Sequence, residues 1–298
     1  MTVDNLPSDA EMADEVGVER TQDSVLSTRA IALVEVSGGK NRRPLVNFKS
    51  WPLLWSLTRQ QLITRYRQST FQLAWIVIQP VAFMIVYAFF FHGVLQVDSG
   101  NVPYLSFVAA GLIPWRFISI GLNNTTSITD SIHLISKAYF PKELIPLSGV
   151  LAGTIDLAIG TIVLFTIVLI EGGSLSYHVI GLPFAYLLLL LSTATVSIFL
   201  SAVAVFIRDV AHMMTLISIG VFFATPIMYQ SDQLPTWLQW FPAINPFAIA
   251  ISNVRDLVLF GRWFPVTGYL IHLGVAVVLF LGSLAYVRSI ESRMVDVA

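Results

Sequence analysis

The stretch VIGLPFAYLLLLLSTATVSIFLSAVAVF, Val179–Phe206, contains no charged side chain. It is longer than the roughly 20 apolar residues that a helix needs to cross the hydrocarbon core of a bilayer. The same character recurs in Phe71–Leu95, Ile145–Ile170, Ala211–Tyr229 and Pro265–Val287. Each of these stretches predicts a transmembrane helix.

A sixth span is predicted at Tyr104–Ile128, although it contains Arg116 and ends in the polar run of residues 123–126. Its first half is apolar, and its polar end is interpreted as the exit into a cytoplasmic loop. The sequence therefore predicts an all-α membrane protein with six transmembrane helices.

Composition supports a membrane protein and excludes several other classes. The 298 residues are 55% hydrophobic and only 12% charged, whereas soluble domains carry about 25% charged residues. A net charge of −1 gives no indication of a nucleic-acid partner. Because the chain has no cysteine, disulfides, thiolate metal sites and thiol catalysis are excluded.

The distribution of basic residues predicts the orientation. Most of the 17 Lys and Arg residues precede the first span, follow the last one, or lie in the loops after spans two and four. The opposite side has only Arg255 and Arg262. Because cytoplasmic segments are enriched in Lys and Arg, both termini are predicted to be cytoplasmic.

Three regions follow from this topology. Residues 1–50 form an acidic N-terminal tail that is poor in aromatic residues and is expected to be partly disordered. Residues 51–290 form the membrane domain, and residues 291–298 form a short cytoplasmic tail.

The segment before the first span is strongly basic and predicts an amphipathic interfacial helix. Trp51, Trp55, Leu62 and Tyr66 share one stripe of a helix, which Arg59 interrupts. Such a helix lies on the inner leaflet with its basic side chains near lipid phosphates. The alternative is ordinary positive flanking of the first span.

The loop between spans two and three contains Pro141 and Pro146, which are expected to delimit a short helix bearing Lys142 and Glu143. Tyr139 and Phe140 are expected to be exposed just before it. Exposed aromatic side chains beside charges are typical of protein-docking surfaces. An ordinary loop with interfacial aromatic residues explains the pattern equally well.

The segment Gln230–Trp263 is apolar, but Pro235, Pro242 and Pro246 interrupt it. Irregular backbone at membrane depth needs protein or water beside it. The segment therefore predicts two short re-entrant helices on the outer side, between spans five and six. An interfacial aromatic belt is the alternative, and it does not explain the prolines.

Aromatic side chains are dense within spans one, two and five. Sugar rings stack on aromatic rings through their C–H faces, so these residues are candidates for a polysaccharide path, whereas lipid contact or packing is the alternative for each one. The candidates are Phe83, Tyr87, Phe90, Phe91, Trp115, Phe222 and Tyr229.

Two charges lie within spans, Arg116 and Asp156. A charge at mid-membrane costs at least about 2.5–3.5 kcal/mol, so such residues usually pair or face water. Their depths in spans two and three are similar, which predicts an ion pair or a shared polar network. An ion pair that fixes helix registry and a substrate contact are both open.

Four motifs resemble those of permease subunits of ABC type-2 exporters, in the branch that exports polysaccharide, O-antigen or polyol phosphate. They occur in this order in the chain: Arg65-Tyr-Arg67, Lys137-Ala-Tyr-Phe-Pro-Lys-Glu143, Phe206-Ile-Arg-Asp209, and Pro226-Ile-Met-Tyr229 followed by Asn245-Pro246 and Arg255. The resemblance covers nearly the whole chain beyond the N-terminal tail.

This resemblance implies a homodimer that works with two copies of a separate ATPase subunit. It implies that Tyr139, Phe140, Pro141, Lys142, Glu143 and Leu144 form an ATPase-coupling segment, that Trp55, Arg59, Arg65, Tyr66 and Arg67 belong to a gate helix, and that Arg208 and Asp209 form a second cytoplasmic loop.

The chain is not expected to be an enzyme or to hold a cofactor. A P-loop needs the pattern G-x-x-x-x-G-K-[ST], and Gly39-Lys40 is followed by Asn41 and lacks the upstream glycine. The energy for transport must then come from a partner, from a gradient, or not at all, and the resemblance implies that ATP and Mg bind to the partner ATPase. No zinc-protease or serine-hydrolase motif is present.

The predicted function is a channel-forming subunit that exports a lipid-linked cell-surface polysaccharide across the bacterial inner membrane. Export of another amphiphile, such as a drug or a lipid, is the alternative within the family. A membrane enzyme acting on a polyprenyl-linked substrate is the alternative from another class. The dispersed outer carboxylates Asp98, Glu171, Asp232 and Asp256 disfavour it. A gradient-driven transporter would be expected to have more mid-span carboxylates than Asp156.

Overall fold

The computed structural model describes residues 50–66, 72–97, 99, 102–131, 141–207 and 209–297. Within these ranges every regular element is a helix, as predicted. The first 49 residues lie outside the described part of the chain, and so do Tyr139, Phe140, Arg67 and Arg208.

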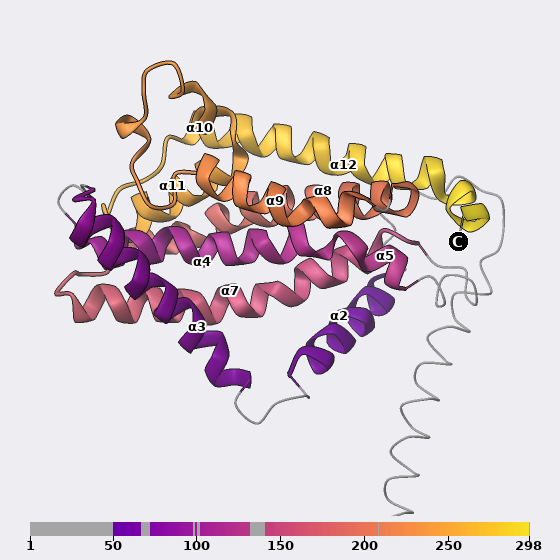
Figure 1. The fold of residues 1–298 in the computed structure, drawn as a ribbon, viewed down its shortest axis with the longest axis horizontal. Coiled ribbons are helices and arrows are strands. Elements are labelled where there is room, and N and C mark those ends of the chain that lie inside the picture. The colour runs from indigo at the N-terminus through magenta and orange to yellow at the C-terminus, as the bar shows by residue number, and fades with distance from the viewer. Residues whose placement is uncertain are drawn as a thin grey trace, which may run out of the picture.

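The helices follow the predicted order of spans (Figure 1). They are α2 (Trp51–Tyr66), α3 (Gln72–Tyr87) with a π-helical continuation (Ala88–Val94), α4 (Tyr104–Asn123), α5 (Ser127–Asp130), α7 (Leu144–Ile170), α8 (Leu182–Phe206), α9 (Asp209–Ala224), α10 (Trp240–Ile244), α11 (Pro246–Val258) and α12 (Val266–Val297). Short 3₁₀ turns at Asn124–Thr126, Tyr177–Gly181 and Ser231–Gln233 lie between them.

Four helical stretches within the described residues are long and apolar enough to cross a membrane. They are Tyr104–Asp130, Leu144–Ile170, Tyr177–Phe206 and Val266–Glu291. The helices at predicted spans one and five contain shorter apolar stretches, Ile78–Val94 and Asp209–Ala224. The fold is therefore an all-α bundle with four clear candidate membrane helices and two shorter apolar ones.

The C-terminal ends of the helices at spans five and six differ from the prediction. The helix at span five ends at Ala224 instead of Tyr229, because Pro226 disfavours helical backbone at the residue before it. The helix at span six continues beyond Val287 to Val297. There Val287 and Met294 pack against Ile128 of α5 in a small apolar cluster. Residues 291–297 are thus helical and continuous with the bundle.

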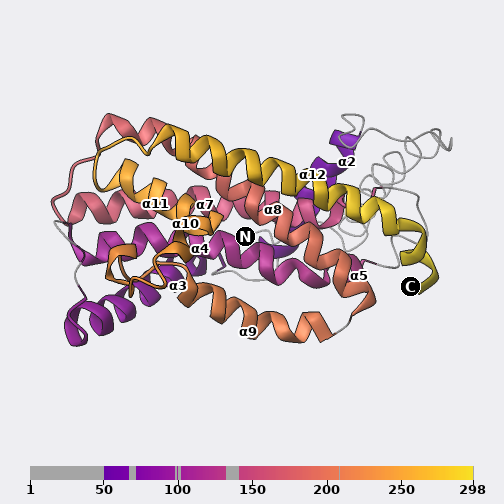
Figure 2. The ribbon, with the colours of Figure 1, turned by 90° about the horizontal axis from the view of Figure 1, so that it is seen from above.

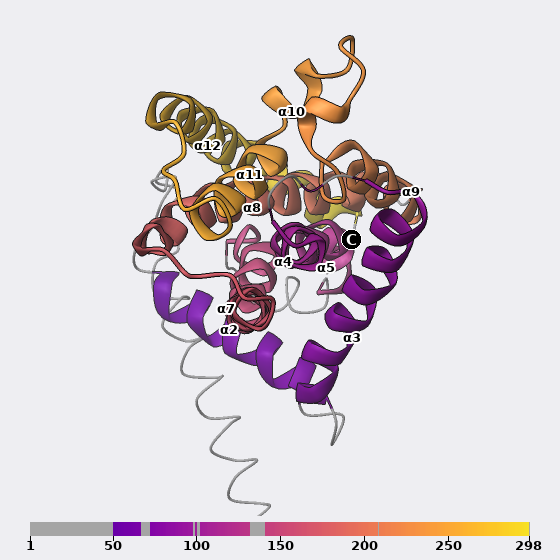
Figure 3. The same cartoon turned by 90° about the vertical axis from the view of Figure 1, so that its left-hand side faces the viewer.

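The central helices α4, α7 and α8 run side by side along the length of the bundle (Figures 1 and 2). The last helix, α12, packs on α8, while α2 packs across α7. Figure 3, viewed along the bundle, shows α3 and α9 together at one edge. The core between these helices contains Phe107, Phe117, Leu188 and Leu189, all nearly inaccessible.

Small residues allow the close approach of the central helices, as is usual in membrane bundles. A Cβ atom built on Gly121 of α4 would lie 2.2 Å from Cγ2 of Thr193 on α8. One built on Gly160 of α7 would lie 2.8 Å from Ile113 of α4. These glycines set the separation between α4 and its two neighbours.

Two short helices, α10 and α11, occur where the prolines predicted them. Asn245 caps α11, since its side-chain oxygen accepts from the Phe247 amide at 3.0 Å. Pro246 follows as the first helical residue, where its missing N–H is not needed. Most of α11 is buried against α8 and α4, so this helix is an integral part of one end of the bundle.

Candidate functional site

A groove of about 550 Å³ lies between α3, α4 and α9. Four of the seven predicted path residues line it: Phe83 and Tyr87 from α3, Trp115 from α4, and Phe222 from α9. The other lining residues are Pro80, Leu112, Arg116, Ser119, Asn123, Ser218, Ile219 and Phe223. The consecutive helices α3 and α4 and the distant helix α9 thus bring four of the expected aromatic side chains together.

The aromatic side chains form a connected group. The Tyr87 and Phe222 ring centroids are 5.9 Å apart, and those of Trp115 and Phe222 are 5.2 Å apart. Phe83 stacks on Tyr87 at 6.2 Å. These separations are typical of favourable aromatic pairs. The group presents ring faces and edges with few fixed hydrogen-bonding partners.

Three predicted path residues do not line this groove. The π-helical turn Ala88–Val94 changes the phase of the helix. Phe91 still pairs with Tyr87, their ring centroids 6.2 Å apart, but neither Phe90 nor Phe91 is part of the groove lining. Phe90 is exposed and contacts Phe89. Tyr229 lies beyond the end of α9 and donates its hydroxyl hydrogen to the Phe223 carbonyl at 2.7 Å.

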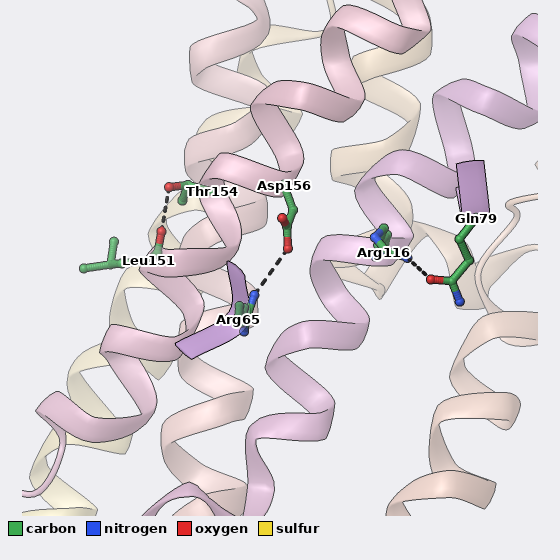
Figure 4. A network of polar contacts seen from close by, with 6 residues as sticks. All are labelled: Arg65, Gln79, Arg116, Leu151, Thr154 and Asp156. Atoms are coloured by element: carbon green, nitrogen blue, oxygen red, sulfur yellow. Dashed lines mark hydrogen bonds and ion pairs between the residues drawn. The ribbon is translucent and has the colours of Figure 1, made fainter. Parts of the chain in front are cut away.

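The two charges within the spans have partners that differ from the expected pair (Figure 4). Asp156 of α7 forms an ion pair with Arg65 of α2 at 3.3 Å. Arg116 of α4 donates to the side-chain oxygen of Gln79 on α3, also at 3.3 Å. Arg116 and Asp156 border a common crevice of about 10 Å³, but no ion pair joins them within the described residues. Arg65 reaches Asp156 because α2 lies across α7.

The helix α2 has two distinct faces. Leu54 and Thr58 are buried, and the helix packs mainly against α7. Trp51 and Trp55 are 61% and 63% exposed, and Arg59 is also exposed. Tryptophan side chains on an exposed face next to basic residues are typical of helices at a membrane interface.

The segment before α7 differs from the expected exposed docking helix. Pro141, Lys142 and Glu143 form a turn that leads directly into α7, and Pro146 lies in the first turn of that helix, where proline is tolerated. Lys142, Glu143 and Leu144 are buried. Within the described residues, this segment therefore packs into the protein instead of presenting its charges to solvent.

Both buried charges contact the C-terminal part of α12. Glu143 accepts from Nε and Nη2 of Arg288 at 3.0 and 2.8 Å. Lys142 donates to the Glu291 carbonyl at 2.8 Å. Burial lowers the pKa of Lys142, and the nearby Glu291 carboxylate partly offsets this shift. The end of α12 thus holds the segment that the resemblance assigns to ATPase coupling.

At the opposite end of the bundle, Arg255 connects three elements. Its guanidinium donates to the carbonyls of Pro226 at 2.7 Å and Ile227 at 2.5 Å, and it lies 3.7 Å from the Phe107 ring centroid. Tyr104 supports the same turn by donating to the Met228 carbonyl at 2.8 Å. Residues 226–228 and Arg255, which belong to the fourth of the family-like motifs, therefore form one structural unit.

The structure adds partners that the sequence did not indicate. The sequence did not predict that Gln79 accepts from Arg116, or that Arg288 pairs with Glu143. Gln79 carried a usable signal, because it is a polar residue inside an apolar span. Arg288 carried none beyond its position at the membrane boundary.

Asp209 begins α9 and is exposed. No cluster of metal-binding side chains occurs among the described residues.

Comparison with known proteins gives the family. Residues 52–259 match the family described as "ABC-2 type transporter". Two proteins of Klebsiella pneumoniae named "O-antigen export system permease protein RfbA" are 34% and 32% identical over 212 residues, which is 70% of this chain and 81% of each relative. A Myxococcus xanthus protein of the same name is 30% identical over 178 residues, 59% of this chain and 68% of that protein. The chain belongs to the ABC-2 type transporter family.

Proposed function

We propose that this chain is the transmembrane, channel-forming subunit of an ATP-driven exporter that moves a lipid-linked cell-surface polysaccharide across the bacterial cytoplasmic membrane. The observation that carries the proposal is the aromatic groove of Phe83, Tyr87, Trp115 and Phe222. The family match and the relatives named as O-antigen export permeases support it.

In the proposed arrangement, six helices cross the membrane, namely the four long ones together with α3 and α9. The termini are cytoplasmic, α2 lies at the inner interface, and α10 and α11 enter the membrane from outside. The aromatic residues Trp51 and Trp55 on the exposed face of α2 support its interfacial position.

The functional assembly is proposed to contain two copies of this chain and two copies of a separate ATPase subunit, which binds ATP and Mg. The groove lies at the edge of the bundle formed by α3 and α9. Two such grooves facing each other would enclose a path lined on both sides by aromatic rings.

The mechanism follows from the connections of α7. Closure of the ATPases on ATP would move the coupling segment around Phe140–Leu144, and α7 would carry this motion to α2 through the Arg65–Asp156 ion pair. Separation of the two copies at α3 and α9 would then open the path. Aromatic walls suit a moving glycan because stacking on sugar faces does not fix one register.

The test is co-expression of this chain with the P-loop ATPase subunit that accompanies it, followed by measurement of polysaccharide at the cell surface. Alanine at Tyr87 and Phe222 should reduce export while the two-subunit complex still forms and hydrolyses ATP. Leu259, on α11's C-terminal side and away from the groove, provides a control for a truncated apolar side chain. Unchanged export by the double Tyr87→Ala, Phe222→Ala variant would refute the assignment of this path.

A further inference from the structure

The chemistry of the groove changes along its length. Ser119 and Asn123 follow Arg116 along α4 toward the end of the bundle where α12 ends, and Ser218 lies on the facing wall in α9. Toward the other end, the Phe222 ring pairs with the rings of both Tyr87 and Trp115. One part of the mainly apolar lining therefore contains the polar side chains, another part is aromatic, and Arg116 lies between them.

Arg116 carries a charge that the described residues do not neutralise. The nearby carboxylate, Asp156, pairs with Arg65. The hydrogen bond made by Arg116 is to Gln79, which is an uncharged acceptor. No carboxylate among the described residues forms an ion pair with Arg116. This arrangement does not fit a structural ion pair between α4 and α7.

Uncommitted hydrogen-bond donors lie around the same point. Nε of Arg116 and the hydroxyl of Ser218 are buried atoms without a hydrogen-bond partner among the described residues. A guanidinium has five N–H donors in a planar fork, and buried donors normally have partners. Arg116 therefore has hydrogen-bonding capacity that the described residues do not use, and its side chain is part of the groove lining.

Of the two spaces beside Arg116 among the described residues, the groove has room for an anion and the crevice does not. The crevice between Arg116 and Asp156 holds about 10 Å³, which is no more than the space for a single water molecule. The groove holds about 550 Å³, within the range of sites that bind small molecules. The planar fork of arginine matches the oxygen atoms of phosphate in a bidentate manner.

We propose that Arg116 binds a phosphate-type anionic group on the amphiphile that enters the groove, with the sugar or apolar part against the aromatic half. Arg116 is thus a specificity-determining residue that selects anionic over neutral amphiphiles. This inference rests on the proposed export function, because that function supplies the amphiphile. The binding test below needs neither ATPase nor transport, so the two proposals can fail separately.

The test compares two probes that differ only by a phosphate, farnesyl phosphate and farnesol, on the purified full-length chain in dodecyl maltoside. Affinity is measured by scintillation proximity with tritiated farnesyl phosphate and by competition with unlabelled farnesol. The wild type should prefer the phosphate by at least about tenfold, equivalent to about 1.4 kcal/mol. In Arg116→Gln the preference should fall to about one.

Three further measurements complete the test. Arg116→Lys keeps the positive charge and should retain part of the preference for farnesyl phosphate over farnesol. This result would distinguish loss of charge in Arg116→Gln from misfolding. Arg262→Gln removes an exposed arginine at the outer end of the bundle and should retain all of it. The Arg116→Lys and Arg262→Gln variants should both elute at the wild-type volume in size-exclusion chromatography.

Competition identifies the source of the anion. Neither inorganic phosphate nor phosphatidylglycerol should displace farnesyl phosphate at equal concentration if the site selects an anion on the transported amphiphile. Displacement by inorganic phosphate would overturn the requirement for an amphiphile, and displacement by phosphatidylglycerol would overturn the link to transported cargo. Equal binding of the two farnesyl probes by the wild type, or an undiminished preference in Arg116→Gln, would overturn the role of Arg116.

Discussion

At the scale of single residues, charged side chains connect the parts of this bundle more than their small number suggests. Arg255 is buried and binds two backbone carbonyls of the turn after α9. Arg65 crosses from α2 to Asp156 of α7. Because a charge is costly to bury without partners, each of these residues fixes a specific arrangement of elements.

The first prediction concerns Arg255. Arg255→Leu removes the donors to the carbonyls of Pro226 and Ile227, and unsatisfied buried acceptors cost about 1–3 kcal/mol each. The midpoint of thermal unfolding in detergent should fall by several degrees. Arg262→Gln is the matched control, because Arg262 is mostly exposed and surface ion pairs contribute about 0–1 kcal/mol. Equal midpoints for both variants would contradict the structural role of Arg255.

The sequence predicted which charges are unusual but not their partners. Arg116 and Asp156 are recognisable because they interrupt apolar spans. Their partners depend on how helices cross, and Arg65 is separated from Asp156 by 91 positions. The prediction compared only the depths of Arg116 and Asp156 along spans two and three. It could not take into account α2, which packs across α7.

At the scale of elements, close helix packing depends on glycine. Gly121→Ala would place a methyl group 2.2 Å from Cγ2 of Thr193, so α4 and α8 must move apart, which typically costs about 1–3 kcal/mol. The unfolding midpoint should fall, and Thr193→Ser in the same chain should restore part of it by removing the colliding methyl group. Gly274→Ala, where nothing lies within 4 Å, should leave the midpoint unchanged. Absence of rescue by Thr193→Ser would show that this contact does not limit the packing.

The second prediction at this scale concerns the contact between α12 and the segment before α7. Arg288→Gln weakens hydrogen bonds to the buried Glu143 carboxylate, and bonds to charged groups contribute about 1.5–3 kcal/mol. If α12 positions the coupling segment, export per ATP hydrolysed should fall while ATPase binding persists. Arg293→Gln, on an exposed position of the same helix, is the control.

Exchanging the two charges tests the contact between Glu143 and Arg288 in a second way. The double variant Glu143→Arg, Arg288→Glu keeps opposite charges in contact and should recover part of the coupling lost in Arg288→Gln. Coupling that is normal in Arg288→Gln would show that the α12 contact is not needed for transmission.

The pattern of apolar residues predicted where the helices lie. It did not predict which residues share a helix face where the backbone departs from α-helical geometry. The apolar stretches became helices at all six predicted positions. Spacing arguments assume 3.6 residues per turn, which the π-helical turn Ala88–Val94 does not have. Phe90 is exposed beside Phe89, and Phe91 pairs with Tyr87 without lining the groove. The groove itself required the positions of α3, α4 and α9 relative to each other, which no single helix encodes.

At the scale of the whole molecule, topology is directly testable because the chain has no cysteine. Single cysteines at Ser174, Ser231 and Arg293, all exposed positions, can be labelled in intact spheroplasts with an impermeant maleimide. Six spans place Ser174→Cys and Ser231→Cys outside and Arg293→Cys inside. If only the four long helices crossed, Ser174→Cys and Arg293→Cys would share one side and Ser231→Cys the other.

The most direct test of the central claim is ATP-dependent transport in proteoliposomes that contain the full chain and its ATPase subunit, with the ATPase facing outward. Lipid-linked polysaccharide added outside should become protected from externally added glycosidase only when both subunits and hydrolysable ATP are present. Protection that needs no ATP or no ATPase, or a complex that hydrolyses ATP yet never protects the glycan, would contradict the account.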